Sequence, residues 1–532
     1  MPASSTRDRV ALAALAFGAV AVVLAAAPYK AFDLDRYFVP KELVLHASAA
    51  VAALAIVVGA RRLTLTTVDW LLAGFLVTSA ASAALATNLW TAERALAISV
   101  SGALLFWTAG ALRRAGGASV LLVALAASVV LAAATSLAQA YGVQTELFSL
   151  NRAPGGTFGN RNFIAHYAAI GTPVVALAAL TAPRGLGSIF GGIGIATLSA
   201  ALVMSRSRAA WLAVLVLAII TSALAFTTRD RWREPRTVRR LLVLAAAAVA
   251  GAVAAVALPN RLEWKSESPY LDSAAGLVNY KEGSGRGRLV QYGNSLRMTA
   301  AQPVLGVGPG NWPVAYPHYA SRNDPSMSQD DGLTANPWPS SDWVALLSER
   351  GVVAFGLLVA AVTALLGRTI GDLRGGHGRD RERVLTAIAL IGTIAAAAVV
   401  GAFDAVLLLA APTFLFWTLA GALAPPPRAG RASGGTRVWG TALVLGAGGV
   451  AVGRSAAQLA AMATFNASTR VVSLADAARL DPGSYRIRLR LAQSYLARGD
   501  CARARTEARA ARALFPSAAE PKHVLAACGS RS

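Results

Sequence analysis

Residues 118–139 read ASVLLVALAASVVLAAATSLAQ, an uncharged apolar run that follows Arg113 and Arg114 after a short turn. A helix needs about 20 apolar residues to cross roughly 30 Å of hydrocarbon. The run is long enough, and basic residues just before it are typical of the cytoplasmic end of a membrane span. The same unit, an apolar run bounded by basic residues, recurs along most of the chain and decides the fold class.

We predict twelve or thirteen membrane spans. The candidate runs are 10–29, 43–60, 67–87, 94–112, 118–139, 163–182, 186–204, 209–227, 241–258, 351–367, 384–403, 405–424 and 438–458. Clusters of Arg come after every second run, so a chain that starts in the cytoplasm returns there at each cluster. The predicted fold is an all-α polytopic helix bundle, with a cytoplasmic N-terminus and an external C-terminus.

The composition agrees with a membrane protein. The hydrophobic fraction is 55% and the charged fraction only 14%, against roughly 25% charge in soluble domains. The net charge of +23 would indicate nucleic acid in a soluble protein, but much of it is the Arg of inner connections, so no nucleic-acid partner is expected. Arg7, Arg9 and the following run also resemble a secretory signal; the run is longer than usual, which favours an uncleaved first span.

Two long hydrophilic stretches are predicted to be external. One covers about 259–350 between two spans, and the other runs from about 459 to 532. Nucleoside triphosphates and nucleotide sugars are absent on that side, which excludes kinases and nucleotide-sugar transferases working there. Any substrate must arrive through or in the membrane. We therefore predict a membrane domain over 1–458 and a small external domain over 459–532.

The external tail resembles the tetratricopeptide repeat. Pro482 and Pro516 lie 34 residues apart, with Gly499 and the small residues Ala504 and Ala508 between them. Small residues where two helices touch, a Gly turn and a closing Pro are typical of that repeat. The alternative is a plain helical hairpin rich in Ala and Arg. Both interpretations predict a packing or docking module, with a protein partner as one expected occupant.

The chain has two cysteines, Cys501 and Cys528, and both fall in this tail. No Cys or His stands at ligand spacing from either of them, so they form no metal motif. In the repeat register each lies near the end of a helix, and antiparallel packing brings those ends together. A disulfide is therefore expected outside the cytoplasm.

Arginines in three external segments are the strongest sign of chemistry. They are Arg152 and Arg161, Arg206 and Arg208, and Arg286 and Arg288. Positive charge outside runs against the topology bias and suits a polyanion with a lipid tail, such as a diphosphate-linked polyprenol. Guanidinium groups bind phosphate oxygens in pairs and stabilise charge on a departing diphosphate. The alternative partners are lipid head groups or loop carboxylates.

Several motifs together resemble the O-antigen ligase and O-antigen polymerase superfamily. They are Gly156-Thr157-Phe158-Gly159-Asn160-x-Asn162-Phe163, Ser207-Arg208, Arg288-x3-Tyr292, the run from Pro303 to Trp312, and the segment from Trp343 to Gly351. They occur in the family's order within a matching hydropathy profile, over about residues 150–420. The run Gly306-x-Gly308-x-Gly310 is no dinucleotide fingerprint, since no βαβ pattern surrounds it.

The resemblance implies transfer of a glycan from an undecaprenyl-diphosphate carrier to an acceptor hydroxyl, in a helical fold of the GT-C kind. It implies no metal and no cofactor, with Arg208 and Arg288 holding the diphosphate and Arg161 and Arg286 as further candidates. It also implies a bacterial inner membrane location with a periplasmic tail. Ligase, polymerase and protein oligosaccharyltransferase stay open, with lipid A core, another glycan or a protein as acceptor.

The base that activates the acceptor is not obvious. The family places a His-Asn pair before the helix that re-enters the membrane, and here those positions read Ser340-Ser341. Because serine is no base near neutral pH, Asp342 or His318 is the candidate substitute. The alternatives are an acid at a helix start for Asp342 and a packed loop residue for His318.

A flippase or exporter is the competing class of protein. Transporters usually carry ionisable residues within their spans. The middles of the predicted spans have almost none, which favours a transferase that works at the outer surface.

Overall fold

The computed structural model describes residues 5–59, 65–149, 152–182, 186–264, 266–276, 283–328, 331–375, 380–425 and 436–529. Within these ranges the chain forms helices joined by turns and loops, without a β-strand. The predicted all-α class is confirmed.

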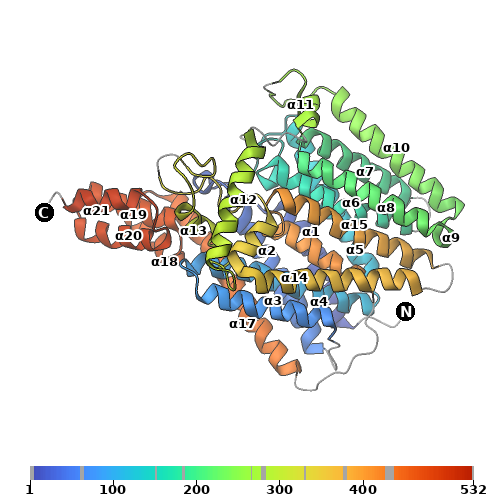
Figure 1. The fold of residues 1–532 in the computed structure, drawn as a ribbon, viewed down its shortest axis with the longest axis horizontal. Helices are drawn as coiled ribbons and strands as arrows, with labels where there is room; N and C mark the ends of the chain where they lie inside the picture. Colours follow the sequence, from blue (N-terminus) through green and yellow to red (C-terminus); the bar gives the residue numbers. More distant parts are fainter. Residues whose placement is uncertain are drawn as a thin grey trace.

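Each predicted span corresponds to a helix of the bundle (Figure 1). These helices are α1 (Thr6–Leu24), α2 (Asp35–Gly59), α3 (Thr67–Ala84), α4 (Leu89–Arg114), α5 (Ala118–Ala140), α6 (Arg161–Thr181), α7 (Leu186–Ser205), α8 (Arg208–Thr227), α10 (Pro235–Ala257), α14 (Asp342–Gly375), α15 (Arg381–Phe403), α16 (Ala410–Leu423) and α17 (Thr436–Ala467). Eleven helices in the described part of the chain are long and apolar enough to cross a membrane. Helices α1 and α16 are not among those eleven.

Helix α16 is shorter than the predicted span 405–424. Its 14 residues extend about 21 Å at 1.5 Å per residue, less than the hydrocarbon thickness. The segment before it is not helical, and two of its backbone N–H groups, at Val406 and Leu407, donate to the Asp342 carboxylate at 2.8 and 2.9 Å. Irregular backbone at membrane depth needs such internal partners. The Asp342 carboxylate supplies them, which allows the helix to begin late.

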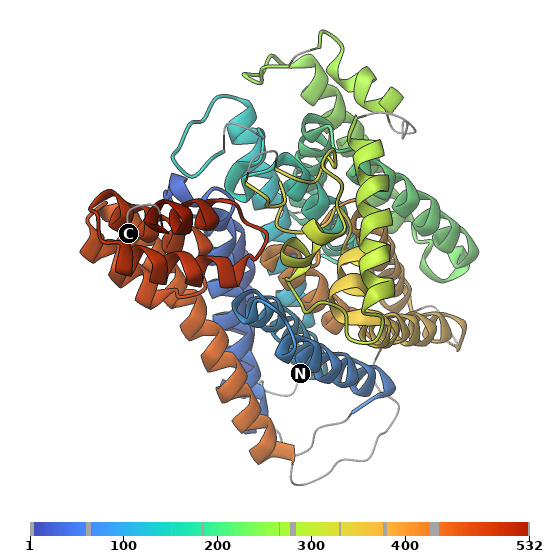
Figure 2. The ribbon, with the colours of Figure 1, turned by 60° about the vertical axis from the view of Figure 1, so that its left-hand side comes forward.

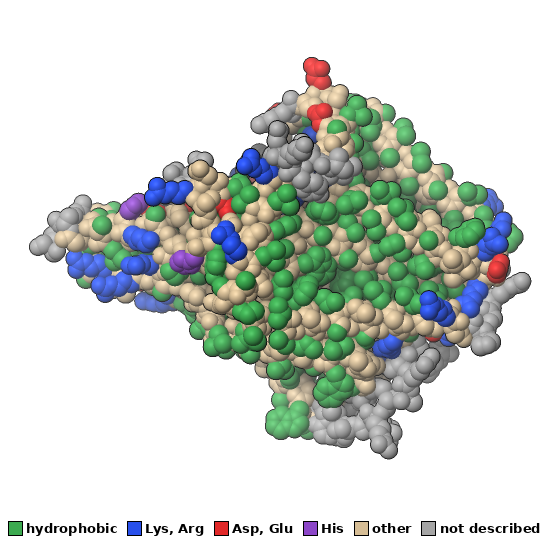
Figure 3. Space-filling model, in the orientation of Figure 1, with side chains coloured by type: hydrophobic (Ala, Val, Ile, Leu, Met, Phe, Trp, Pro, Cys, Tyr) green, Lys and Arg blue, Asp and Glu red, His purple; other side chains and the backbone are tan. Residues whose placement is uncertain are grey.

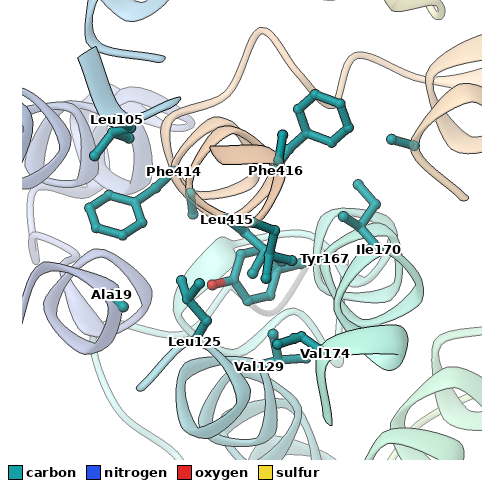
Figure 4. Packing of buried hydrophobic residues seen from close by; sticks show 14 of the residues in the cluster. Ala19, Leu105, Leu125, Val129, Tyr167, Ile170, Val174, Phe414, Leu415 and Phe416 are labelled. Carbon is teal, nitrogen blue, oxygen red and sulfur yellow. The ribbon is translucent and has the colours of Figure 1, made fainter. Parts of the chain in front are cut away.

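The core lies around α16, where buried side chains from several helices meet (Figure 4). Leu415 lies beside Tyr167 and Leu125, and Phe414 points the other way, toward Leu105 and Ala19, all of them buried. Small residues let neighbouring backbones approach: a Cβ on Gly421 would lie 2.2 Å from the Phe106 carbonyl oxygen. Because lipid tails are as apolar as the core, close van der Waals packing of this kind holds membrane helices together.

The large loop that the sequence predicts to be external carries helix α12 (Gly283–Ala301), with short pieces at α11 (Pro269–Ala275), α13 (Trp312–Ala315) and η4 (Tyr316–His318). Its glycine run is folded back onto the start of α14. Gly310 and Trp312 donate backbone N–H bonds to the Glu349 carboxylate at 2.8 and 3.1 Å. Gly306 has a φ of 66°, and a Cβ there would lie 2.4 Å from the Glu349 carbonyl carbon. The glycines therefore allow a close approach that other residues would block.

The tail continues from α17 through α18 (Val471–Leu480), α19 (Tyr485–Ala497), α20 (Cys501–Leu514) and α21 (Glu520–Gly529). It lies against the same end of the bundle as the large loop (Figure 2). The Asn88 amide donates to the Leu514 carbonyl at 3.2 Å, and the Ala519 N–H donates to the Asp331 carbonyl at 2.9 Å. Helix α17 runs unbroken through the predicted domain boundary at 458, and the repeat identity of the tail stays a prediction.

The expected Cys501–Cys528 disulfide is present, with a sequence separation of 27 residues. By the chain-entropy estimate a loop of this length is stabilised by roughly 3–4 kcal/mol. We predict that reduction lowers the melting temperature of the tail while the membrane helices stay folded, as read by circular dichroism with and without reductant. Two freely alkylated thiols in peptide mapping of the unreduced protein would contradict the assignment.

The loop and the tail lie at one end of the bundle, and an apolar band separates them from basic residues at the other end (Figure 3). We predict that reporters fused after residues 235 and 375 read as cytoplasmic and those after 280 and 500 as external. A cytoplasmic reading at 500 would remove an odd number of spans and overturn the predicted orientation.

Candidate active site

A buried histidine lies among three bundle helices, at the end of the bundle that carries the large loop. His166, in α6, has Nε2 3.3 Å from the hydroxyl of Ser207, which directly precedes α8. Its Nδ1 lies 3.9 Å from the Asp404 carboxylate, just after the end of α15. That distance is too long for a hydrogen bond, and Nδ1 is a buried atom without a hydrogen-bond partner in the described part of the chain. The Nδ1 atom of His166 is therefore open to a hydrogen-bond donor or acceptor, depending on the tautomer of the ring.

Asp404 is the accessible acid of this cluster. Its side chain keeps 16% of its surface exposed, and one carboxylate oxygen accepts a bond from the Ala405 N–H at 2.9 Å. Burial raises the pKa of Asp404 to about 6, against the opposing effects of the nearby Arg288 and Arg152 guanidinium groups. A carboxylate with this pKa is largely ionised at neutral pH and can still accept a proton.

Helix α12 holds Arg288 over the cluster. One turn further along, the Tyr292 hydroxyl donates to the carbonyls of Ser340 at 2.6 Å and Ala402 at 2.9 Å. These bonds fix α12 against the start of α14 and the end of α15. Since residues four apart share a helix face, Arg288 lies on the side of α12 that Tyr292 fixes to these two elements, and its charge acts on both Asp404 and His166. Arg286, two residues earlier, is exposed.

The Gly156–Asn162 motif builds the loop that brings two further arginines together. The Arg161 N–H donates to the Arg152 carbonyl at 3.0 Å and closes the loop. Asn160 accepts from the Asn162 N–H at 3.0 Å and begins α6. Arg161 also lies over the Trp264 ring, with Cζ 5.5 Å from its centre. The motif thus positions Arg152, Arg161 and the start of the helix that carries His166.

The two arginines of the Ser205–Arg208 turn contact different parts of the loop. Arg206 has a left-handed φ of 54°; its Nε donates to the Ser273 hydroxyl at 2.9 Å and its Cζ lies 4.7 Å above the Trp264 ring. Arg208 begins α8 and donates to the Gly276 carbonyl. Since Ser207 between them reaches His166, Arg208 lies one residue along the chain from the cluster.

The two predicted bases have different surroundings. Asp342 is fully buried, and both of its carboxylate oxygens accept the backbone bonds that order the segment before α16. His318 is exposed. Its neighbour Tyr319 accepts a bond from Arg297, which is about 14 Å along α12 from Arg288 at 1.5 Å per residue. His318 therefore lies at the far end of α12 from Arg288, whereas Asp342 lies beside Asp404, whose backbone carbonyl accepts the Asp342 N–H at 3.2 Å.

Sequence reasoning missed His166 and Asp404 as site residues. His166 follows the recognised Asn160-x-Asn162-Phe163 element by a single helical turn, and Asp404 is the one acid between two successive apolar runs. Each signal is weak by itself, because only the packing of α6 against α15 joins residues so distant in the chain.

Comparison with known protein families adds an independent result. Residues 193–359 match the family model described as O-antigen ligase. The matched segment contains Arg208, Arg288, His318 and Asp342, while His166 and Asp404 lie on either side of it. No curated protein matches the chain. Residues 193–359 of this multi-pass membrane protein are therefore similar to the O-antigen ligase domain, and the match supports the predicted resemblance to the O-antigen ligase superfamily.

Proposed function

We propose that the protein is a glycosyltransferase that moves a glycan from an undecaprenyl-diphosphate carrier to an acceptor hydroxyl, on the periplasmic face of the inner membrane. The observation that carries the proposal is a partly exposed carboxylate, Asp404, that lies 3.9 Å from the buried His166 and within the electrostatic influence of Arg288. A cation for a diphosphate and a carboxylate for a hydroxyl proton are the two groups that the reaction needs.

Asp404 is the base in this proposal. The acceptor oxygen attacks the anomeric carbon, and a new glycosidic bond forms as the bond from that carbon to the diphosphate oxygen breaks. The electron pair of the broken bond leaves on the diphosphate, and the hydroxyl proton passes to Asp404. Its pKa of about 6 is close to the operating pH, where a general base works best.

Arg288 binds the diphosphate and stabilises the charge that appears on it as it leaves. Arg208 is the second diphosphate ligand, supported by its place next to Ser207 and by its position in the O-antigen ligase domain. Arg161 and Arg286 are proposed as outer contacts of the same polyanion. His166 positions Asp404 from the buried side, since its free Nδ1 faces that carboxylate at 3.9 Å.

A clean deletion tests the proposal and separates its variants. We expect envelope glycans on gels to show carrier-linked polymer without its final acceptor if the protein is a ligase, and single-unit capping if it is a polymerase. Loss of glycan from a protein band indicates a protein acceptor. If the deletion leaves the carrier-linked polymer, the chain length of the capped glycan and the glycosylated protein band all unchanged, the proposal is contradicted.

A further inference from the structure

A cavity lies at the end of the bundle opposite Arg288, Asp404 and His166, which we call the Arg288 cluster. Helix α4 begins next to Asn88, which contacts the tail, and its 26 residues extend about 39 Å to Arg114. The cavity opens beside this far end, between α2, α3, α4, α14, α16 and α17, with a volume of about 450 Å³. That volume lies in the range of ligand pockets, roughly 300–1,000 Å³.

The cavity has apolar walls and a basic rim. Its walls include Ile56, Val57 and Phe106, with Leu443 on α17. Apolar walls between membrane helices suit a hydrocarbon chain better than a soluble ligand.

Three arginines stand on the rim, Arg113, Arg114 and Arg368, with one acid, Asp69. The Asp69 carboxylate already accepts bonds from the Trp107 indole at 2.8 Å and from the Thr66 hydroxyl at 2.7 Å. Its charge is thus held by uncharged donors, and the rim keeps an excess of positive charge.

Arg113 has an open donor. Its Nη1 is buried and has no hydrogen-bond partner in the described part of the chain. Asp372 is the acid that acts on it most, and that carboxylate lies 3.6 Å from Arg383. A buried guanidinium nitrogen without a partner loses free energy unless an external acceptor binds it.

We propose that this cavity binds an anionic phospholipid of the leaflet opposite the Arg288 cluster, with its phosphate between Arg113 and Arg368 and one acyl chain against the apolar walls. Basic pockets between membrane helices on the cytoplasmic side bind anionic lipid head groups in this way. The site is separate from the proposed glycan transfer, and its occupant is a lipid of the bilayer.

Native mass spectrometry of the purified protein in mild detergent tests the proposal, with phosphatidylglycerol, phosphatidylcholine and soluble glycerol 3-phosphate as probes. Phosphatidylglycerol is expected to bind in preference to the other two. Arg113→Ala/Arg368→Ala should weaken its binding about 25-fold, since each basic residue near a head group contributes roughly a factor of five. The matched control is Arg374→Ala, an exposed Arg on the same helix as Arg368.

A second variant fills the cavity and leaves every charge in place. A Cβ on Gly110, which lines the cavity, meets ordinary contacts at 3.7 Å, so Gly110→Leu should fold and lose most of the lipid binding. Equal binding of the two phospholipids, equal loss in Arg374→Ala, or glycerol 3-phosphate binding as tightly as phosphatidylglycerol would each overturn the proposal. If the double variant does not fold, full lipid binding by Gly110→Leu overturns it alone.

Discussion

Arg288→Lys is expected to slow glycan transfer by about 10²–10³-fold, the usual loss when one preorganised transition-state donor is removed. Lysine keeps the positive charge, but it presents a single ammonium where the guanidinium offers a two-pronged contact to phosphate oxygens. The measurement is the initial rate of transfer in membranes that contain equal amounts of each variant.

Arg322→Lys is the matched control, because Arg322 is exposed in the same external loop. It should transfer glycan at the wild-type rate. If both variants transfer at that rate, the diphosphate does not bind at Arg288. If both are slow, the effect comes from the loop as a whole.

Asp404→Asn is expected to lower the rate by about 10²–10⁴-fold, the contribution of a positioned general base. In the wild type, activity should rise with pH through about 6, the pKa of Asp404, because only the ionised carboxylate accepts the proton. The groups that face this carboxylate are Arg288, Arg152, His166 and Asp342. The acidic limb of the pH profile should disappear in the variant, together with most of the activity.

The stability of the same variant separates catalysis from folding. Because burial raises the pKa of Asp404 in the folded state, its contribution to stability is fully present below about pH 4 and is lost as the pH rises through about 6. Asp404→Asn should therefore melt at or above the wild-type temperature near neutral pH. A lower melting temperature would show that the lost activity reflects damage to the fold.

Asp342→Asn and His318→Ala compete with this assignment. Asparagine at 342 turns an amide donor toward the Val406 and Leu407 N–H groups, and an unsatisfied buried donor costs about 1–3 kcal/mol. We expect Asp342→Asn to lower stability and His318→Ala to be mild. Abolished transfer at normal stability in either variant would move the base from Asp404 to that residue.

The bundle could be predicted from the sequence because the bilayer fixes the length of each apolar run. Helix α14 shows where that rule fails. The predicted span began at Gly351, but the helix begins at Asp342 and has a kink at Gly351, where φ is 75°. Apolar length cannot reveal the helical turns before Gly351, which carry the buried charged residues Asp342, Glu349 and Arg350, nor the irregular segment before α16.

The candidate site was partly predictable. Arg288 and Tyr292 lie one turn apart, so a local motif identified them. Asp404 and His166 were missed because their proximity depends on how α6, α12 and α15 pack, and no local pattern encodes that contact. The same packing explains why Asp342, chosen for its place in the sequence, has backbone partners at both oxygens.

The most direct measurement is transfer in proteoliposomes that contain only the purified protein, a labelled undecaprenyl-diphosphate glycan and the acceptor identified by the deletion. We predict that labelled glycan becomes covalently attached to the acceptor as undecaprenyl diphosphate is released in equal amount, and that Arg288→Lys and Asp404→Asn each lose nearly all of this reaction. Labelled glycan that stays on its carrier with the folded wild-type protein, or transfer at the wild-type rate by both variants, would contradict the account.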